Sequence, residues 1–198
     1  MLWFFSDPHF WHANIIRYSN RPYRNVDEMN DAIIENTNAL VGENDELFCL
    51  GDWAMYGGRG HERQIASDLL RRFRCRRIHL VFGNHDKPRR EIAPAFTSAN
   101  DMMEIKVPDG GNRQSIVLCH YALRVWNKSH HGSWHLYGHS HGSLTDDPHS
   151  LSFDVGVDCH DYKPISYDQV KAIMARKTWK PVDHHGKRDI DRVDRDRI

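Results

Sequence analysis

Apolar runs typical of strands alternate with amphipathic stretches typical of helices in the first half of the chain. Residues 2–6, 46–50 and 77–82 are short and rich in aromatic or β-branched side chains, as buried strands are. Apolar residues recur with helical spacing at 27–41 and 61–73, and Gly42 ends the first of these stretches. Strands that alternate with helices predict a parallel sheet with helical crossovers.

The second half of the chain changes pattern after Pro94. Strand-like runs dominate there, the turn sequence PDGGN separates the first two, and the last element is a helix at 166–177 with Ser166 as its N-cap. We therefore expect an α/β domain at 1–182, with parallel strands first and an antiparallel half second. The strand-like runs are 102–107, 114–119, 134–138 and 152–157.

Residues 183–198 contain five acidic and five basic side chains and few apolar ones, which predicts a charged, flexible tail. Over the whole chain 27 basic residues balance 27 acidic ones, so no net field recruits nucleic acid or an anionic membrane. No apolar run approaches the roughly 20 residues that span a bilayer. The four cysteines are far apart, and we expect reduced, buried thiols in a cytoplasmic protein.

Polar side chains with metal-binding or acid–base chemistry follow five of the apolar runs. In an open α/β sheet, ligands bind in the crevice beyond the carboxyl ends of the strands. One polar strand end is typical of a loop, but five that carry carboxylates, imidazoles and an amide predict a site for divalent transition metals. Gly51, Gly83 and Gly138 stand where the chain must turn sharply beside that site. The polar residues are Asp7, His9, Asp52, Asn84, His85, His120, His139 and His141.

The order of these motifs, D-x-H, G-D, G-N-H-D, a lone strand-end histidine and G-H-x-H, resembles the calcineurin-like metallophosphoesterase superfamily. The match runs from Leu2 to about Val170, and the segments HANIIRYSNRP and HYALRVWN are similar to small bacterial and phage phosphoesterases. The resemblance implies a four-layer α/β/β/α sandwich with mixed sheets. It also implies two divalent metal ions at the edge of the sandwich, drawn from manganese, iron, zinc or nickel.

The resemblance also implies a role for each residue. His85 matches the family's non-ligand histidine, which gives a proton to the leaving group. The sequence WAMYGG that follows Asp52 departs from the protein-phosphatase branch, and the acid that orients the histidine in that branch is missing. The implied ligands are Asp7, His9, Asp52 and His141 for metal one and Asp52, Asn84, His120 and His139 for metal two, with Asp52 bridging.

Elementary chemistry agrees with these roles. Two divalent ions about 3.5–4 Å apart can hold a hydroxide and neutralise phosphoryl charge. A shared carboxylate such as Asp52 reduces the repulsion between the ions, and an amide such as Asn84 adds a ligand without adding charge. A histidine such as His85 titrates near neutral pH, which suits a proton donor.

Other polar groups have two interpretations. His12 and Arg17 follow the first metal loop and could contact a bound phosphate, whereas a solvated helix face explains Arg17 equally well. Asp86 is more typical of a turn residue that binds backbone N–H groups. Lys87, Arg89 and Arg90 follow the third metal loop, which places them near a substrate.

Two further groups could contact a nucleotide. The arginine-rich run at 71–77 lies at the amino end of its strand, so we expect it to complement a helix dipole and solvent instead. Four aromatic residues could stack on a base, although core packing explains them more simply. They are Trp11, Trp53, Tyr56 and Trp126.

The sequence therefore predicts a metal-dependent phosphoric ester hydrolase. Its partner would be a small phosphodiester or nucleotide-like substrate, and we expect no membrane partner. A non-catalytic scaffold on the same fold is the alternative, as the resemblance to a retromer subunit of the superfamily implies. A nuclease is less favoured, because the balanced charge gives little attraction for nucleic acid.

Overall fold

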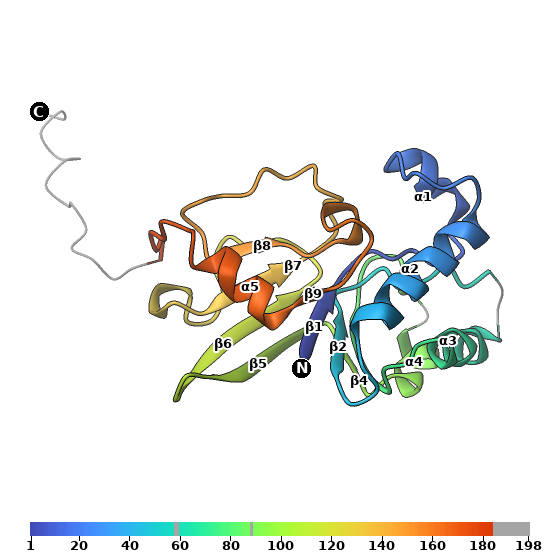
Figure 1. Cartoon of the computed structure of the whole chain (residues 1–198), viewed down its shortest axis with the longest axis horizontal. Helices are drawn as coiled ribbons and strands as arrows, with labels where there is room; N and C mark the ends of the chain where they lie inside the picture. The colour runs from blue at the N-terminus through green and yellow to red at the C-terminus, as the bar shows by residue number, and fades with distance from the viewer. Residues whose placement is uncertain (58–59, 88, 184–198) are drawn as a thin grey trace, which may run out of the picture.

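A computed structural model describes residues 1–57, 60–87 and 89–183 and contains two β-sheets with helices packed around them (Figure 1). The predicted tail at 183–198 lies outside the described residues except for Asp183. The mixed α/β class that the sequence predicts is confirmed, with two sheets that each contain parallel and antiparallel pairs.

The first sheet holds the predicted parallel strands in the order β4-β3-β2-β1-β9. Strands β1 to β4 run parallel, and β9 pairs antiparallel with β1. Three of these strands match predicted runs, whereas β4 and β9 are too short to show a periodic pattern. The strands are β1 (Leu2–Phe5), β2 (Glu46–Cys49), β3 (Arg77–Val81), β4 (Ser98–Asn100) and β9 (Ile165–Ser166).

The second sheet has the order β5-β6-β7-β8. Strands β5 and β6 form the predicted antiparallel hairpin around Gly110 and Gly111, both of which have positive φ. The expectation of an antiparallel second half is otherwise wrong, because β7 runs parallel to both β6 and β8. Long connections return the chain to the same end of the sheet before each strand. The strands are β5 (Met102–Asp109), β6 (Asn112–Cys119), β7 (Trp134–Tyr137) and β8 (Ser152–Asp154).

Among the described residues, three of the five α-helices match predicted helices, and the two that sequence patterns missed, α1 and α4, have six and four residues. Within the described part of the chain, no helix is long and apolar enough to cross a bilayer. Three short 3₁₀ turns lie at Ala93–Ala95, Ser129–His131 and Val157–Cys159. The α-helices are α1 (Ala13–Tyr18), α2 (Val26–Leu40), α3 (Glu62–Arg71), α4 (Arg89–Ile92) and α5 (Tyr167–Met174).

Successive side chains along the strands of the first sheet point to opposite faces, and this divides the apolar interior into two cores. Trp3 and Phe5 on β1 face the helices α2 and α3, whereas Phe4 between them faces the second sheet. Helix α5 contributes Val170 and Met174 to the core that lies between the two sheets. A helical layer over the outer face of the second sheet, as in a four-layer sandwich, stays a prediction.

The thiols are only partly as expected. The four cysteines are free, and Cys49 and Cys75 are buried as predicted. Cys119 is half-buried and Cys159 is exposed, because it ends a 3₁₀ turn at the surface. Burial of all four thiols is therefore wrong for Cys159.

Ser166 caps α5 as the sequence predicts, through a reciprocal pair of hydrogen bonds. Its Oγ accepts the Gln169 N–H at 3.3 Å, and the Ser166 N–H donates to Gln169 Oε1 at 2.9 Å. We expect Ser166→Ala to lower the free energy of unfolding by about 1 kcal/mol, measured by urea denaturation. Ser67→Ala, in the interior of α3, is the control and should be neutral or slightly stabilising because alanine favours helix. A drop of equal size in the control would contradict the capping role.

Candidate metal centre

The loops after β1, β2, β3, β6 and β7 converge on one cavity of about 570 Å³. Its lining includes His85, Ile15 and Tyr18 besides most of the predicted ligands. Asp7 and His120 lie against this lining, through contacts with His9 and Asn84. The structure therefore brings together all seven predicted ligands: Asp7, His9, Asp52, Asn84, His120, His139 and His141.

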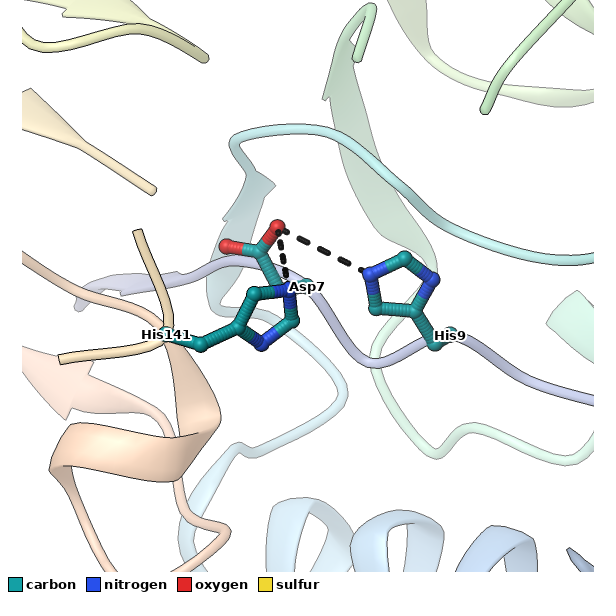
Figure 2. Close-up of side chains that lie close together, drawn as sticks. All are labelled: Asp7, His9 and His141. Carbon is teal, nitrogen blue, oxygen red and sulfur yellow. Dashed lines mark ion pairs between the residues drawn. The ribbon is translucent and has the colours of Figure 1, made fainter. Parts of the chain in front are cut away.

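Asp7, His9 and His141 form the first cluster, with both histidine rings turned toward the carboxylate (Figure 2). The Nε2 atoms of His9 and His141 each lie 4.0 Å from Asp7 Oδ1. Asp7 Oδ1 and His9 Nε2 are buried and have no hydrogen-bond partner among the described residues. Donors that share one ion at about 2.0–2.2 Å lie roughly 3–4 Å apart. The unpartnered atoms and their spacing fit a metal ion between them.

Asp52 joins this cluster to a second one that contains His120 and His139, and it also lies within 4.8 Å of His9 and His85 in a third group. Asp52 Oδ2 lies 3.5 Å from His9 Nε2 and 3.6 Å from His120 Nε2, so one oxygen faces both clusters. Asn84 Oδ1 lies 3.1 Å from His120 Nε2. The two clusters are buried at Asp7, His9, Asp52 and His120, half-buried at His141 and exposed at His139. They can therefore hold metal ions on both sides of the Asp52 carboxylate.

Five of the seven predicted ligands have a left-handed backbone conformation. This conformation is rare outside glycine and costs about 1–3 kcal/mol at a residue held there by its surroundings. It turns the chain sharply at each strand end, so that the side chain points into the cavity. The five residues are Asp7 (φ 57°), His9 (φ 52°), Asp52 (φ 53°), His139 (φ 69°) and His141 (φ 47°).

All three predicted glycines lie where side chains of the site press against backbone. Gly51 has φ 108°, and a Cβ atom at this position would overlap the His120 ring. A Cβ atom on Gly83 would overlap the Asp52 carboxylate, and one on Gly138 would overlap the Asp7 carboxylate. The three positions require glycine, as the sequence predicts, because the approach leaves no room for a side chain.

Hydrogen bonds behind the cavity orient two of the histidines. His120 Nδ1 lies 2.8 Å from the Leu50 carbonyl oxygen, and His141 Nδ1 lies 2.7 Å from Asp158 Oδ2. Each bond leaves Nε2 facing the clustered carboxylates. A metal-binding histidine characteristically makes such a bond with its other nitrogen.

Arg21 and Asp158 support the site, and sequence reasoning missed both. The buried Arg21 donates to both oxygens of Asp158 at 2.8 Å and to the carbonyl oxygens of Asp7 at 2.7 Å and Pro8 at 3.0 Å. Burial opposes ionisation of Asp158, but hydrogen bonds from His141 and Arg21 outweigh it and lower its pKa. Asp158 belongs to no motif, and Arg21 lies in the segment HANIIRYSNRP, which implied no role for it. Because 136 residues separate the two along the chain, no local signal could have revealed that they pair.

Asp86 binds backbone, which agrees with its interpretation as a turn residue. It accepts the N–H groups of Asp52 at 2.8 Å, Trp53 at 3.0 Å and Gly83 at 2.8 Å. Burial raises the pKa of Asp86 to about 6 even though these donors oppose the rise. The carboxylate therefore joins the ends of β2 and β3 beneath the cavity.

His85 and His12 lie beside each other at the cavity, next to His9. Their ring centroids are 5.5 Å apart, and each lies 5.1 Å from the His9 ring. His12 Nδ1 is 3.2 Å from His9 Nδ1. Both are therefore within the group of polar side chains that could meet a ligand.

The basic residues considered for phosphate contact lie elsewhere. Arg17 is exposed, lies over the Tyr18 ring at 5.3 Å and does not line the cavity, as the solvated-face interpretation predicts. Arg89 pairs with Asp101 and lies over the Phe82 ring, while Lys87 and Arg90 are exposed. None of these basic residues lines the cavity, and each is exposed at the surface.

The arginine-rich run at 71–77 makes ion pairs away from the cavity. Arg71 pairs with Asp68, Arg72 with Asp31 and Arg77 with Glu46. These pairs agree with the prediction of a solvated, charge-matched surface.

The four aromatic candidates for stacking have different environments. Trp53 is fully buried among Phe5, Phe10 and Phe73, so the core interpretation holds for it. Trp126 is half-buried and packs on the His135 ring, and Tyr56 is half-buried against the first core. Trp11 is exposed.

Burial governs the electrostatics of the first cluster. It raises the pKa of Asp7 to about 8, against the opposing effect of His141. It also lowers the pKa of His9 well below the usual range, and the Arg21 guanidinium adds to this. A cation in the cluster would favour an ionised Asp7 and a neutral His9, which are the forms that bind metals.

No protein-family model matches the chain. The uncharacterised protein MJ1445 of Methanocaldococcus jannaschii is 30% identical over 180 residues, which cover 88% of this chain and 92% of the archaeal protein. The chain belongs to the family of this archaeal protein. The description of MJ1445 names no activity, so the chemistry of the family has to be inferred from the site.

Two solved structures also resemble the chain. A protein of unknown function, AQ665 from Aquifex aeolicus, has a TM-score of 0.62 at 22% identity, covering 87% of this chain and 98% of that one. This similarity shows a shared fold. A structure described as a novel archaeal phosphodiesterase has a TM-score of 0.41 at 11% identity, with 78% of this chain and 81% of that chain covered. A similarity this low supports no conclusion about activity.

The hydrogen bond that His141 donates to Asp158 should be needed for tight metal binding. We expect Asp158→Asn to weaken manganese binding by about 10–100-fold, because the His141 ring loses its charged partner. Calorimetric titration of the metal-free protein with Mn²⁺ measures the change. Asp161→Asn, at an exposed carboxylate nearby, is the matched control and should bind as the unmodified chain does. Equal affinities for the Asp158 and Asp161 variants would contradict the orienting role.

Proposed function

We propose that the protein is a dinuclear metal-dependent phosphoesterase of the calcineurin-like superfamily. Its substrate would be a small phosphodiester or a nucleotide-like phosphoester. The observation that supports this most is the unpartnered pair of buried atoms, Asp7 Oδ1 and His9 Nε2, beside the shared carboxylate of Asp52. Leaving a buried polar atom without a partner costs about 1–3 kcal/mol of folding free energy. A bound cation removes this cost.

The proposed ligands follow the two clusters. Metal one is held by Asp7, His9, Asp52 and His141, and metal two by Asp52, Asn84, His120 and His139. Two divalent ions, when bound, lower the pKa of water and neutralise charge on phosphoryl oxygens, and manganese, iron, zinc and nickel all accept this ligand set. The same proposal includes the four-layer sandwich of the superfamily and a cytoplasmic location.

The remaining side chains at the cavity have roles of their own in this proposal. His85 protonates the departing oxygen, and its backbone N–H donates to Asp52 Oδ1 at 2.8 Å, which fixes it beside the bridging carboxylate. Among the described residues no carboxylate bonds to the His85 ring, and the His9 and His12 rings flank it instead. In this proposal His12 contacts a phosphoryl oxygen.

Turnover of bis-p-nitrophenyl phosphate tests the proposed reaction. We expect hydrolysis that requires added Mn²⁺, Ni²⁺, Co²⁺ or Zn²⁺ and that stops when a chelator is added. Asp52→Asn should lose most of this activity and retain less metal, because the bridge loses its charge. Asp101→Asn, at an exposed carboxylate, is the control and should keep both. Metal binding without turnover of any phosphoester would favour the scaffold on the same fold.

The loss of hydrolysis rate when His85 is replaced should depend on the leaving group of the ester. General acid catalysis contributes about 10²–10⁴-fold, but p-nitrophenolate leaves readily without a proton. We therefore expect His85→Ala to keep its metals and to lose far more activity on an alkyl or nucleoside ester than on a p-nitrophenyl ester. Both rates should be measured at saturating metal, with metal content determined by mass spectrometry. An equal loss on the two esters would show that His85 positions the phosphate and donates no proton.

A further inference from the structure

A second cavity of about 590 Å³ adjoins the metal centre. His12 lines both cavities, so the two share a wall. The second cavity lies between the start of α1, the loop after β2 and helix α3, and its volume is in the range of small-molecule sites. Its lining is mainly apolar and consists of Trp11, His12, Ala13, Asn14, Met55, Gly57, Ile65 and Asp68.

Backbone contacts hold Trp11 at this cavity, and its side chain is not part of the apolar core. Its side chain remains 36% exposed, whereas Trp53 is 0% exposed. Its φ of 61° is unfavourable for a bulky residue, and its N–H donates to the Asn30 side chain at 3.2 Å. The preceding residue, Phe10, is fixed to Ala54 by a β-bridge. Backbone strain that presents an apolar ring to solvent is typical of a binding site.

The position of the cavity matches one side of the proposed reaction. The His12 ring that forms the shared wall lies 5.5 Å from the His85 ring, which is the proposed proton donor. A leaving group that takes a proton from His85 would therefore depart along the side where His12 stands. The second cavity opens on that side, next to Trp11.

The lining has the chemistry of a site for a planar aromatic group. Trp11 offers a face for stacking, and the thioether of Met55, which is 39% exposed, adapts to an aromatic ring. Asn14 offers an amide donor and an acceptor, which suit the polar edge of a base. The carboxylate of Asp68 pairs with Arg71, so its charge is matched at the edge of the cavity.

We propose that this cavity binds the nucleobase of a nucleoside phosphoester whose phosphoryl group lies at the metal centre. The proposal rests on the proposed function for the position of the phosphate, and it adds the class of leaving group. Trp11 stacks on the base, and the nucleoside is the group that departs on the His85 side.

Binding of two non-hydrolysable phosphonates to the manganese-loaded full chain tests the proposal. One is the phosphonate analogue of adenosine 5′-monophosphate, and the other is that of ribose 5-phosphate, which lacks the base. Stacking on one aromatic side chain should make the adenosine analogue bind about 5–100-fold more tightly in calorimetry. Trp11→Ala should remove this preference and leave the affinity for the ribose analogue unchanged, whereas Trp11→Phe should retain most of it.

Trp179→Ala is the matched control, because Trp179 is 38% exposed and lines a different cavity. It should keep the full preference for the adenosine analogue. Equal affinity of the unmodified chain for the two phosphonates, including no measurable binding of either, would overturn the proposal. An equal loss for both ligands in Trp11→Ala would also overturn it. A preference that depends on Trp11 in a protein that hydrolyses no phosphoester would support the base site and reject the proposed catalysis.

Discussion

The arrangement of the site depends on the carboxylate of Asp86, which holds two strand ends together. Its two oxygens accept three backbone N–H groups, from Asp52, Trp53 and Gly83. In return, Asp52 Oδ1 accepts the N–H of His85 on the other loop. These four bonds set the position of the Asp52 side chain, whose carboxylate lies against both clusters of candidate ligands.

The other strand ends are held by different means. Arg21 is buried and bonds to the backbone of the first loop and to Asp158, which in turn bonds to His141. The Asp7 carboxylate accepts the His139 N–H at 2.9 Å through Oδ2, which leaves Oδ1 directed into the cluster. The loops after β1 and β7 are thus joined by charged groups that are largely buried. Hydrogen bonds between such groups are strong because little water screens them.

This arrangement lowers the stability of the fold at several places. Five left-handed residues, two unpartnered buried atoms and a carboxyl with a raised pKa lie within one cavity. The two apolar cores on either side of the first sheet offset these costs. A site with a strained backbone and unpartnered polar atoms gains most from a ligand that supplies positive charge, which is why its geometry favours cations.

The sequence by itself determined the α/β class, the strands of the central sheet and the residues gathered at its edge. It could do so because burial imposes a period of two on strands and 3.6 on helices, and because parallel strands end at a common edge. The parallel run of β7, the exposure of Cys159 and the position of Arg17 were decided only by the tertiary structure. So were the Arg21–Asp158 pair and the cavity beside Trp11. Each depends on contacts between segments far apart in the chain, and such contacts leave no periodic pattern in the sequence around them.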